Sequence, residues 1–131
     1  MTQLLLLFNH HLTPAQEADA IDTLCIDAVV LPPDDICRLW SQIPPELPCL
    51  TDYLHPVRSW FETQAEPGDH VLIQGDFGAC YWAVQTAFAM GLVPIYSTTR
   101  REAVENHLAD GTVQLTHHFR HVMFRKYEDR R

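Results

Sequence analysis

The sequence has 131 residues, of which 47% are hydrophobic and 20% charged, and its formal net charge is −8. These values fit one globular domain, 1–131, and exclude a disordered chain. No apolar run is long enough to cross a bilayer, and the apolar start lacks the basic residues of a secretion signal, so we expect a cytoplasmic protein without a membrane partner.

Charge is distributed unevenly along the chain. Residues 1–99 hold twelve acidic and two basic residues, whereas 100–131 hold five acidic and seven basic ones. The acidic part would repel long nucleic acid, which we exclude as a partner. A compact anion, held by a few arginines and backbone amides, remains compatible with this distribution.

Four cysteines stand at 25, 37, 49 and 80, and none forms a C-x-x-C pair. Without a secretion signal, free and buried thiols are the expected state. A zinc site built from Cys37, Cys49 and His55 would match no standard ligand spacing. We therefore predict no metal site and no cofactor.

Strands and helices are expected to alternate from the start of the chain. Apolar runs predict buried strands over 4–8 and 27–31. Between them a helix opens at Thr13, where Pro14 suits the first helical position and Gln16 completes a capping box. We expect the buried stripe of this helix to be Ala18, Ile21, Leu24 and Cys25.

The middle of the chain continues the alternation. Helices are predicted over 34–42 and within 51–65, where Pro56 either bends the helix or moves its start. A buried strand over 71–73 precedes a helix over 79–90, which Gly91 closes.

The last third is expected to add one strand, one helix and a β segment. The strand covers 93–96, and Ser97, Thr98 and Thr99 then cap a helix over 100–108. Asp110-Gly111 is a turn signal, and 113–127 has β character as one bent strand or a hairpin.

This order predicts an α/β protein of Rossmann-like class. Alternating strands and helices favour a mostly parallel sheet with helices on both faces, to which the last segment can add antiparallel edge strands. Ligands of such sheets bind at the carboxyl ends of the strands. Three loops leave that edge, at 9–12, 75–78 and 97–101.

The chemistry of these loops suits an anion. Hydroxyls at a helix N-terminus attract anions, and the arginines at 100 and 101 add charge, although two cations in a first helical turn oppose the helix dipole. Each feature also has a purely structural interpretation, as a turn, a cap or a solvated surface. In particular, Asp76 can cap the helix that follows it.

The helix over 79–90 is apolar on nearly all sides. A helix of that kind is buried on more than one side, and a chain of this size has little with which to cover it. We therefore predict a homodimer with this helix at or near the interface.

Four segments resemble a known family. The segments 5–10, 71–79, 94–101 and 119–127 are similar, in this order, to motifs of a small Csx-type protein family encoded in type III CRISPR loci. That family is related to the CRISPR-associated Rossmann fold (CARF) and is linked to ring nucleases, which remove the cyclic oligoadenylate messenger of antiviral signalling.

The resemblance implies a ring nuclease that linearises a cyclic oligoadenylate at the homodimer interface. Cyclic tetra-adenylate has approximate two-fold symmetry, which suits an isologous dimer. The implied catalytic residues are His10, Thr98 and Arg100. The implied ligand-binding residues are Asn9, His11, Gln74, Gly75, Asp76, Phe77, Gly78, Ser97, Thr99 and Arg101.

Two other hypotheses remain open. The protein could sequester the same ring without cutting it, or it could be a flavodoxin-like nucleotide-binding domain unrelated to CRISPR. No carboxylate cluster stands at the predicted edge, so a cleaving protein would use the substrate's own 2′-hydroxyl rather than a two-metal site.

Overall fold

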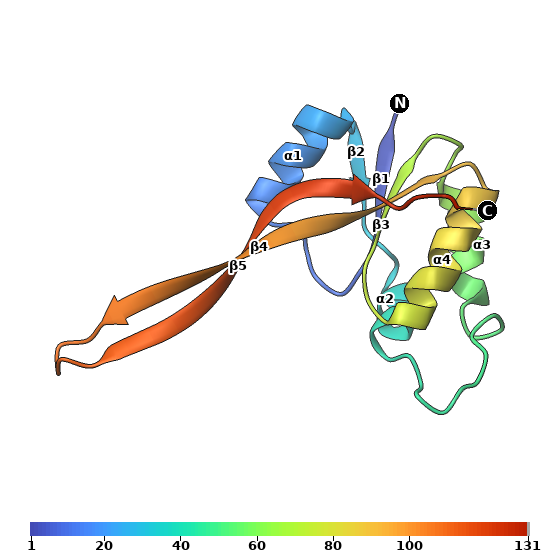
Figure 1. Ribbon diagram of the computed structural model, residues 1–131. Helices are drawn as coiled ribbons and strands as arrows, with labels where there is room; N and C mark the ends of the chain where they lie inside the picture. Colours follow the sequence, from blue (N-terminus) through green and yellow to red (C-terminus); the bar gives the residue numbers. More distant parts are fainter. Residues whose placement is uncertain (131) are drawn as a thin grey trace.

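The computed structural model describes residues 1–130, which form a five-stranded sheet and four helices (Figure 1). In chain order the elements are β1 (Gln3–Leu7), α1 (Pro14–Leu24), β2 (Ala28–Val30), α2 (Asp34–Ser41), α3 (His55–Gln64), β3 (His70–Ile73), α4 (Phe77–Ala89), β4 (Val93–His107) and β5 (Val113–Lys126). None of these helices has the length and apolar character needed to cross a membrane.

The sheet has the order β2-β1-β3-β4-β5. The pairs β1–β2, β1–β3 and β3–β4 are parallel, and β4–β5 is antiparallel. This mixed α/β sheet is compatible with a Rossmann-like fold. It confirms the predicted mostly parallel arrangement with an antiparallel C-terminal edge.

A hydrophobic core lies on each face of the sheet. Leu5 and Leu7 face one core, which α2, α3 and α4 cover, whereas Leu4 and Leu6 face the other, which α1 covers. Successive residues of a strand point to opposite faces, so an unbroken apolar run supplies both cores at once. The apolar runs of β1 and β3 are therefore explained by burial on both sides.

Local sequence signals set most helix boundaries. Thr13 and Gln16 form the predicted capping box of α1, and the Asp76 carboxylate accepts a hydrogen bond from Ala79 N at the start of α4. Pro56 lies in the first turn of α3, so it moves the start of that helix to His55 rather than bending it.

The predicted helix over 100–108 is wrong. These residues continue β4, which runs without interruption from Val93 to His107 and pairs with β5. Glu, Ala, Arg and Leu are good helix formers, but helix propensity is worth little per residue, and tertiary pairing overrides it. The alternating apolar residues of β5 favour a strand, and a strand needs a partner for its backbone hydrogen bonds. Residues 100–107 are that partner, because the turn at Asp110-Gly111 brings them alongside β5.

The predicted buried stripe of α1 is also wrong. Ala20 is the fully buried residue of α1, Leu24 is partly buried, and Ala18, Ile21 and Cys25 are exposed. The cause is a polar contact, because Asp19 turns toward the sheet and pairs with His121 of β5. This contact rotates the helix away from the orientation that apolar spacing alone predicts.

The cysteines are less buried than predicted. Cys25, Cys37 and Cys49 are exposed, and Cys80 is half-buried. All four thiols are free. Exposure follows from position, since Cys25 lies at a helix end, Cys37 faces the open cavity between α2 and β1, and Cys49 lies in a proline-rich loop.

Beyond residue 98 the two C-terminal strands leave the rest of the molecule as a two-stranded ribbon (Figure 1). A β-bulge at Thr98/Thr99 marks the point of departure. We call residues 99–121 the arm and the remaining described residues the body. The arm has no other sheet strand beside it, and apart from its root, where α1 covers His121, its two faces are largely open to solvent.

Candidate functional site

The carboxyl ends of β1 and β3 lie side by side and carry the first two predicted loops. Residues 9–12 follow β1, and residues 74–78 follow β3, with Gln74 N donating a hydrogen bond to Leu7 O at 3.2 Å. Asn9, His10 and His11 are all exposed. The structure therefore brings together two of the three loops that the sequence placed at one edge.

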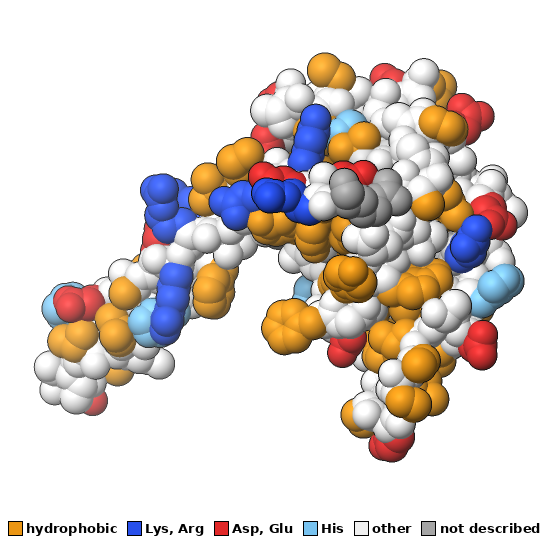
Figure 2. Space-filling view, turned by 45° about the vertical axis from the view of Figure 1, so that its right-hand side comes forward, with side chains coloured by type: hydrophobic (Ala, Val, Ile, Leu, Met, Phe, Trp, Pro, Cys, Tyr) orange, Lys and Arg blue, Asp and Glu red, His pale blue; other side chains and the backbone are white. Residues whose placement is uncertain are grey.

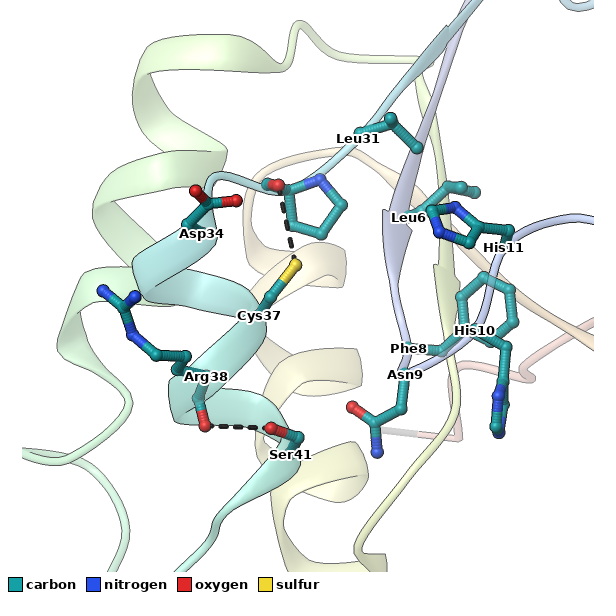
Figure 3. A pocket seen from close by; sticks show the side chains of 11 residues that line it. Leu6, Phe8, Asn9, His10, His11, Leu31, Asp34, Cys37, Arg38 and Ser41 are labelled. Atoms are coloured by element: carbon teal, nitrogen blue, oxygen red, sulfur yellow. Dashed lines mark hydrogen bonds between the residues drawn. The ribbon is translucent and has the colours of Figure 1, made fainter.

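A cavity of about 340 Å³ opens beside the first loop, between β1 and α2 (Figure 3). Asn9 points toward α2, where Ser41 lies, and His11 lies near Leu6. His10 hangs at the rim on the side away from α2, and its ring meets Phe8 edge-on at 6.1 Å. The cavity thus has amide, imidazole and hydroxyl groups on an apolar floor.

No cation is directed into this cavity. Arg38 contributes to its wall, but the guanidinium points away, on the outer side of α2 (Figure 3). The cavity alone therefore offers hydrogen-bond donors without positive charge, and Asp34 places a carboxylate in its wall. Sequence reasoning missed α2 as a wall because only the parallel sheet places that helix beside the end of β1.

The loop after β3 is shaped by a close packing contact. A side chain at Gly75, whose φ is +156°, would meet Trp40 Nε1 at 2.8 Å. The same indole nitrogen donates a hydrogen bond to Gln74 O at 2.9 Å. Gly75 is thus required for the approach of Trp40. Gly78 and Phe77 begin α4 beside it, and the Phe77 side chain is 94% exposed.

Gln74, Ser97 and Thr98 are engaged within the protein. The Gln74 side chain accepts a hydrogen bond from Ser97 N at 2.8 Å, which prolongs the contact between β3 and β4. Thr98 Oγ1 donates to Met123 O and accepts from Met123 N. Ser97 and Thr98 lie inside β4, so the predicted helix N-terminus with its anion-attracting amides does not exist there.

A chain of hydrogen bonds runs through Ser97 at the root of the arm. Gln16 Nε2 lies 3.4 Å from Ser97 Oγ, Ser97 Oγ lies 2.5 Å from His121 Nδ1, and His121 Nε2 lies 2.7 Å from Asp19 Oδ2. The Asp19 carboxylate can only accept, so we assign the proton to Nε2 and the Ser97 hydroxyl as donor to Nδ1. The His121 side chain is 6% exposed.

Sequence reasoning missed Asp19 and His121 as members of this chain. They lie 102 residues apart, on α1 and β5. The only sequence signal for this contact is Asp19 itself, an acidic residue at a helix position that the spacing of apolar residues does not assign to the buried stripe. The chain links α1, β4 and β5, so it fixes the arm to the body.

Thr99, Arg100 and Arg101 lie on the arm rather than at the sheet edge. Arg100 pairs across the ribbon with Arg120, and Arg101 pairs with Phe119. Arg101 is four residues beyond Ser97, or roughly 13 Å along an extended strand. The predicted site residues thus form two groups, one on the edge of the body and one on the arm.

The helix α4 exposes less apolar surface than its composition indicates. Ala79, Ala83, Val84 and Ala87 are buried, and Trp82 and Phe88 pack against the same core. Two aromatic side chains remain open, Phe77 at 94% and Tyr81 at 71% exposure. They are four residues apart and share one side of the helix.

The thiol of Cys80, which lies beside the loop after β3, is unsuited to nucleophilic chemistry. Burial and the neighbouring Asp76 carboxylate raise the pKa of Cys80 to about 11. The thiol therefore stays protonated at neutral pH, and the thiolate is the reactive form. Among residues 1–130, no three His, Cys, Asp or Glu side chains come together as a metal site.

The fold and these residues define a small Rossmann-like α/β protein with a polar sheet edge and a protruding β arm. The chain belongs to the family described as the Uncharacterized protein MJ1673 family, which matches residues 2–125. It is 43% identical over 127 residues to "Uncharacterized protein MJ1673" of Methanocaldococcus jannaschii, covering 97% of this chain and 98% of that protein. No solved structure matches the chain.

Proposed function

We propose that this protein is a ring nuclease of the Csx type, which binds a cyclic oligoadenylate as a homodimer and linearises it to end type III CRISPR signalling. Cyclic tetra-adenylate is the ring that a two-fold dimer fits best. The observation that carries the proposal is the pairing of Asn9-His10-His11 with the Gly75–Gly78 loop at the carboxyl edge of the sheet. Two segments that resemble the family are thereby neighbours in space.

Binding would use both groups of site residues. Arg100 and Arg101 would supply the positive charge that the cavity beside β1 lacks. Phe77 offers an open aromatic face on which an adenine can stack. In a dimer, two bodies and two arms are available to surround one ring. The homodimer is therefore part of the proposal, with the exposed Phe77 and Tyr81 of α4 at or near the interface.

Cleavage would use the 2′-hydroxyl of the ring itself. Its oxygen bonds to the adjacent phosphorus, and the bond from phosphorus to the 5′ oxygen breaks. His10 moves the proton, since an imidazole works in both directions near neutral pH. Arg100 is the proposed donor to the phosphate oxygens, and Thr98 joins it once its hydroxyl leaves Met123 O. The products are a 2′,3′-cyclic phosphate and a 5′-hydroxyl, and no metal takes part.

A single-turnover assay with labelled cyclic tetra-adenylate tests this function. We expect linear product in the presence of EDTA. His10→Ala should slow cleavage by about 10²–10⁴-fold while binding survives. His55→Ala, an exposed histidine at the start of α3, is the matched control and should cleave normally. Activity that requires manganese, or a product with a free 3′-hydroxyl, would overturn the mechanism.

Binding gives a separate measurement. A charge-assisted hydrogen bond contributes about 1.5–3 kcal/mol, so Arg100→Ala should weaken binding about tenfold to a hundredfold. Arg58→Ala removes an exposed arginine of α3 that pairs with Glu62, and it should leave affinity unchanged. Equal affinity of both variants and the wild type would place the phosphates elsewhere, for instance near Arg120 and Arg125.

The second candidate is binding without cleavage. One observation favours it, because the hydroxyls of Ser97 and Thr98 form hydrogen bonds within the protein and are not free to contact a phosphate. A ring retained intact under single-turnover conditions would identify this function. Absence of any binding would leave an unrelated flavodoxin-like nucleotide-binding domain.

A further inference from the structure

The arm has two chemically different faces. Residues directly opposite each other in an antiparallel pair share a face, and successive pairs alternate between faces. One face carries the pairs Arg101–Phe119, Ala103–His117, Glu105–Leu115 and His107–Val113. The other carries Arg100–Arg120, Glu102–His118, Val104–Thr116 and Asn106–Gln114. We call the first the apolar face of the arm.

The apolar face is open to solvent in the single chain. Val113, Leu115 and Phe119 are 53%, 56% and 68% exposed. Figure 2 shows hydrophobic side chains along the length of the arm, between charged ones. The opposite face makes polar contacts of its own, with Asn106 bonded to Thr116 and Arg120 paired with Glu102 at 3.6 Å.

A covered face is what this sequence pattern encodes. In β5 the apolar residues Val113, Leu115 and Phe119 stand on this face and polar residues on the other, with His117 interrupting the apolar series. Such alternation is typical of a strand with one side buried. A two-stranded ribbon is at best marginally stable in water, and it gains stability when its apolar face packs against further structure. The body covers this face only at the root, where the Thr99–His121 pair lies against α1, so the rest of the face needs another molecule to cover it.

We propose that the apolar face of the arm packs against the same face of a second copy of this chain, around a two-fold axis. Two ribbons stacked in this way form a small sandwich, whose layers lie about 10 Å apart as in other stacked sheets. Leu115 and Phe119 of both copies fill the space between them. Each arm then becomes part of a four-stranded unit with its own core.

The charges on this face are self-complementary. Arg101 lies near the root of the arm, and Glu105 lies four residues closer to the tip, roughly 13 Å away along the strand. Arg101 forms no ion pair within residues 1–130. When the arms run antiparallel across a two-fold axis, the root of one meets the tip of the other. Arg101 of each copy then faces Glu105 of the other, twice by symmetry.

This interface is independent of the ligand and of cleavage, and it places the two-fold axis on the arm rather than on α4. It also brings two pairs of Arg100 and Arg101 close to one axis. The arm-to-arm contact does not depend on the ring-nuclease function, and the oligomeric state of the protein tests it separately.

The test is the oligomeric state of the full chain, measured by sedimentation velocity over a wide range of concentration. We expect the wild type to be a dimer. Leu115→Asp places a carboxylate in the apolar contact and should raise the dissociation constant of the dimer at least about tenfold. Gln114→Asp is the matched control, with the same charge on the neighbouring residue but on the opposite face. It should leave the dimer intact, and circular dichroism should show that both variants are folded.

A charge exchange tests the two-fold geometry. Arg101→Glu alone places like charges opposite each other and should weaken the dimer, and adding Glu105→Arg to the same chain should restore it. A monomeric wild type would overturn the proposal, as would equal behaviour of Leu115→Asp and Gln114→Asp. A dimer that is broken by Tyr81→Asp and not by Leu115→Asp would assign the interface to α4 and overturn it equally.

Discussion

The body and the arm are built from the same kinds of residue, but they are held together differently. In the body, Leu4 to Leu7 alternate between two cores, so each of these four side chains is covered by a helix layer. In the arm, Leu115 and Phe119 lie on one face and remain exposed. Strand pairing alone therefore shapes the arm, whereas burial stabilises the body.

The root of the arm is where the two regions meet. Ser97, His121 and Asp19 form a hydrogen-bonded chain across β4, β5 and α1 at the bulge. Tyr127 adds a contact further along, because its hydroxyl donates to Ile73 O at 2.8 Å. Polar contacts thus join the arm to the body at its root, beside Phe124, which is buried in the core that α1 covers.

The largest expected effect is a core truncation in the body. Phe61 is fully buried in the core beneath α3 and α4, so Phe61→Ala should lower the free energy of unfolding by about 3–5 kcal/mol. Val104→Ala on the polar face of the arm should change it by less than about 0.5 kcal/mol. Urea denaturation of both variants measures the contrast, and similar losses would show that the arm shares the stability of the body.

A second contrast uses two glycines. Gly75→Ala forces a methyl group to 2.8 Å from the Trp40 indole nitrogen and should cost about 1–3 kcal/mol. Gly111→Ala at the tip of the arm meets no neighbouring atom, and only its φ of +86° is unfavourable, so it should cost about 1 kcal/mol. Thermal unfolding ranks the two, and a larger loss for Gly111→Ala would contradict the packing role of Gly75.

Removing the contact at the root should loosen the arm selectively. Asp19→Ala leaves the buried Nε2–H of His121 without an acceptor, at a cost of about 1–3 kcal/mol. Amide hydrogen exchange should speed up most in β5 near His121. Asp22→Ala removes an exposed carboxylate from the same helix and serves as control. Uniform exchange changes in both variants would mean that the chain does not hold the arm.

The smallest effect is a pH dependence within the body. Burial lowers the pKa of His70 below its ordinary value of 6.5, Lys126 lowers it further, and Asp69 partly opposes them. The unfolded chain therefore takes up a proton on this ring before the folded chain does. The stability that the neutral ring contributes is present above pH 6.5 and is lost as the pH falls below it.

His70→Gln should therefore reduce the loss of stability between neutral pH and about pH 5. The measurement is the urea midpoint of wild type and variant across that range. His107→Gln, on the exposed arm, is the control and should leave the wild-type slope unchanged. A steeper acid loss in His70→Gln would contradict the lowered pKa.

Local rules predicted the body well because its elements are decided by neighbouring residues. The Thr13–Gln16 capping box, the Asp76 cap and the Pro56 helix start follow from hydrogen bonds and ring geometry within a few residues. The candidate site was partly predictable for the same reason. Asn9, His10 and the Gly75–Gly78 loop leave adjacent strands because a parallel sheet collects its carboxyl ends at one edge.

By itself, the sequence determined the α/β class, the strands of the body and the edge that carries the polar loops. Only the tertiary structure decided that 100–108 is a strand, since its pairing with β5 depends on residues on the far side of the turn. The same holds for Asp19 and His121, whose contact spans 102 residues and overrides the apolar spacing of α1. The spacing of apolar residues predicts which side of a segment packs against a core. It does not predict the geometry where polar contacts or pairing with a distant strand determine it.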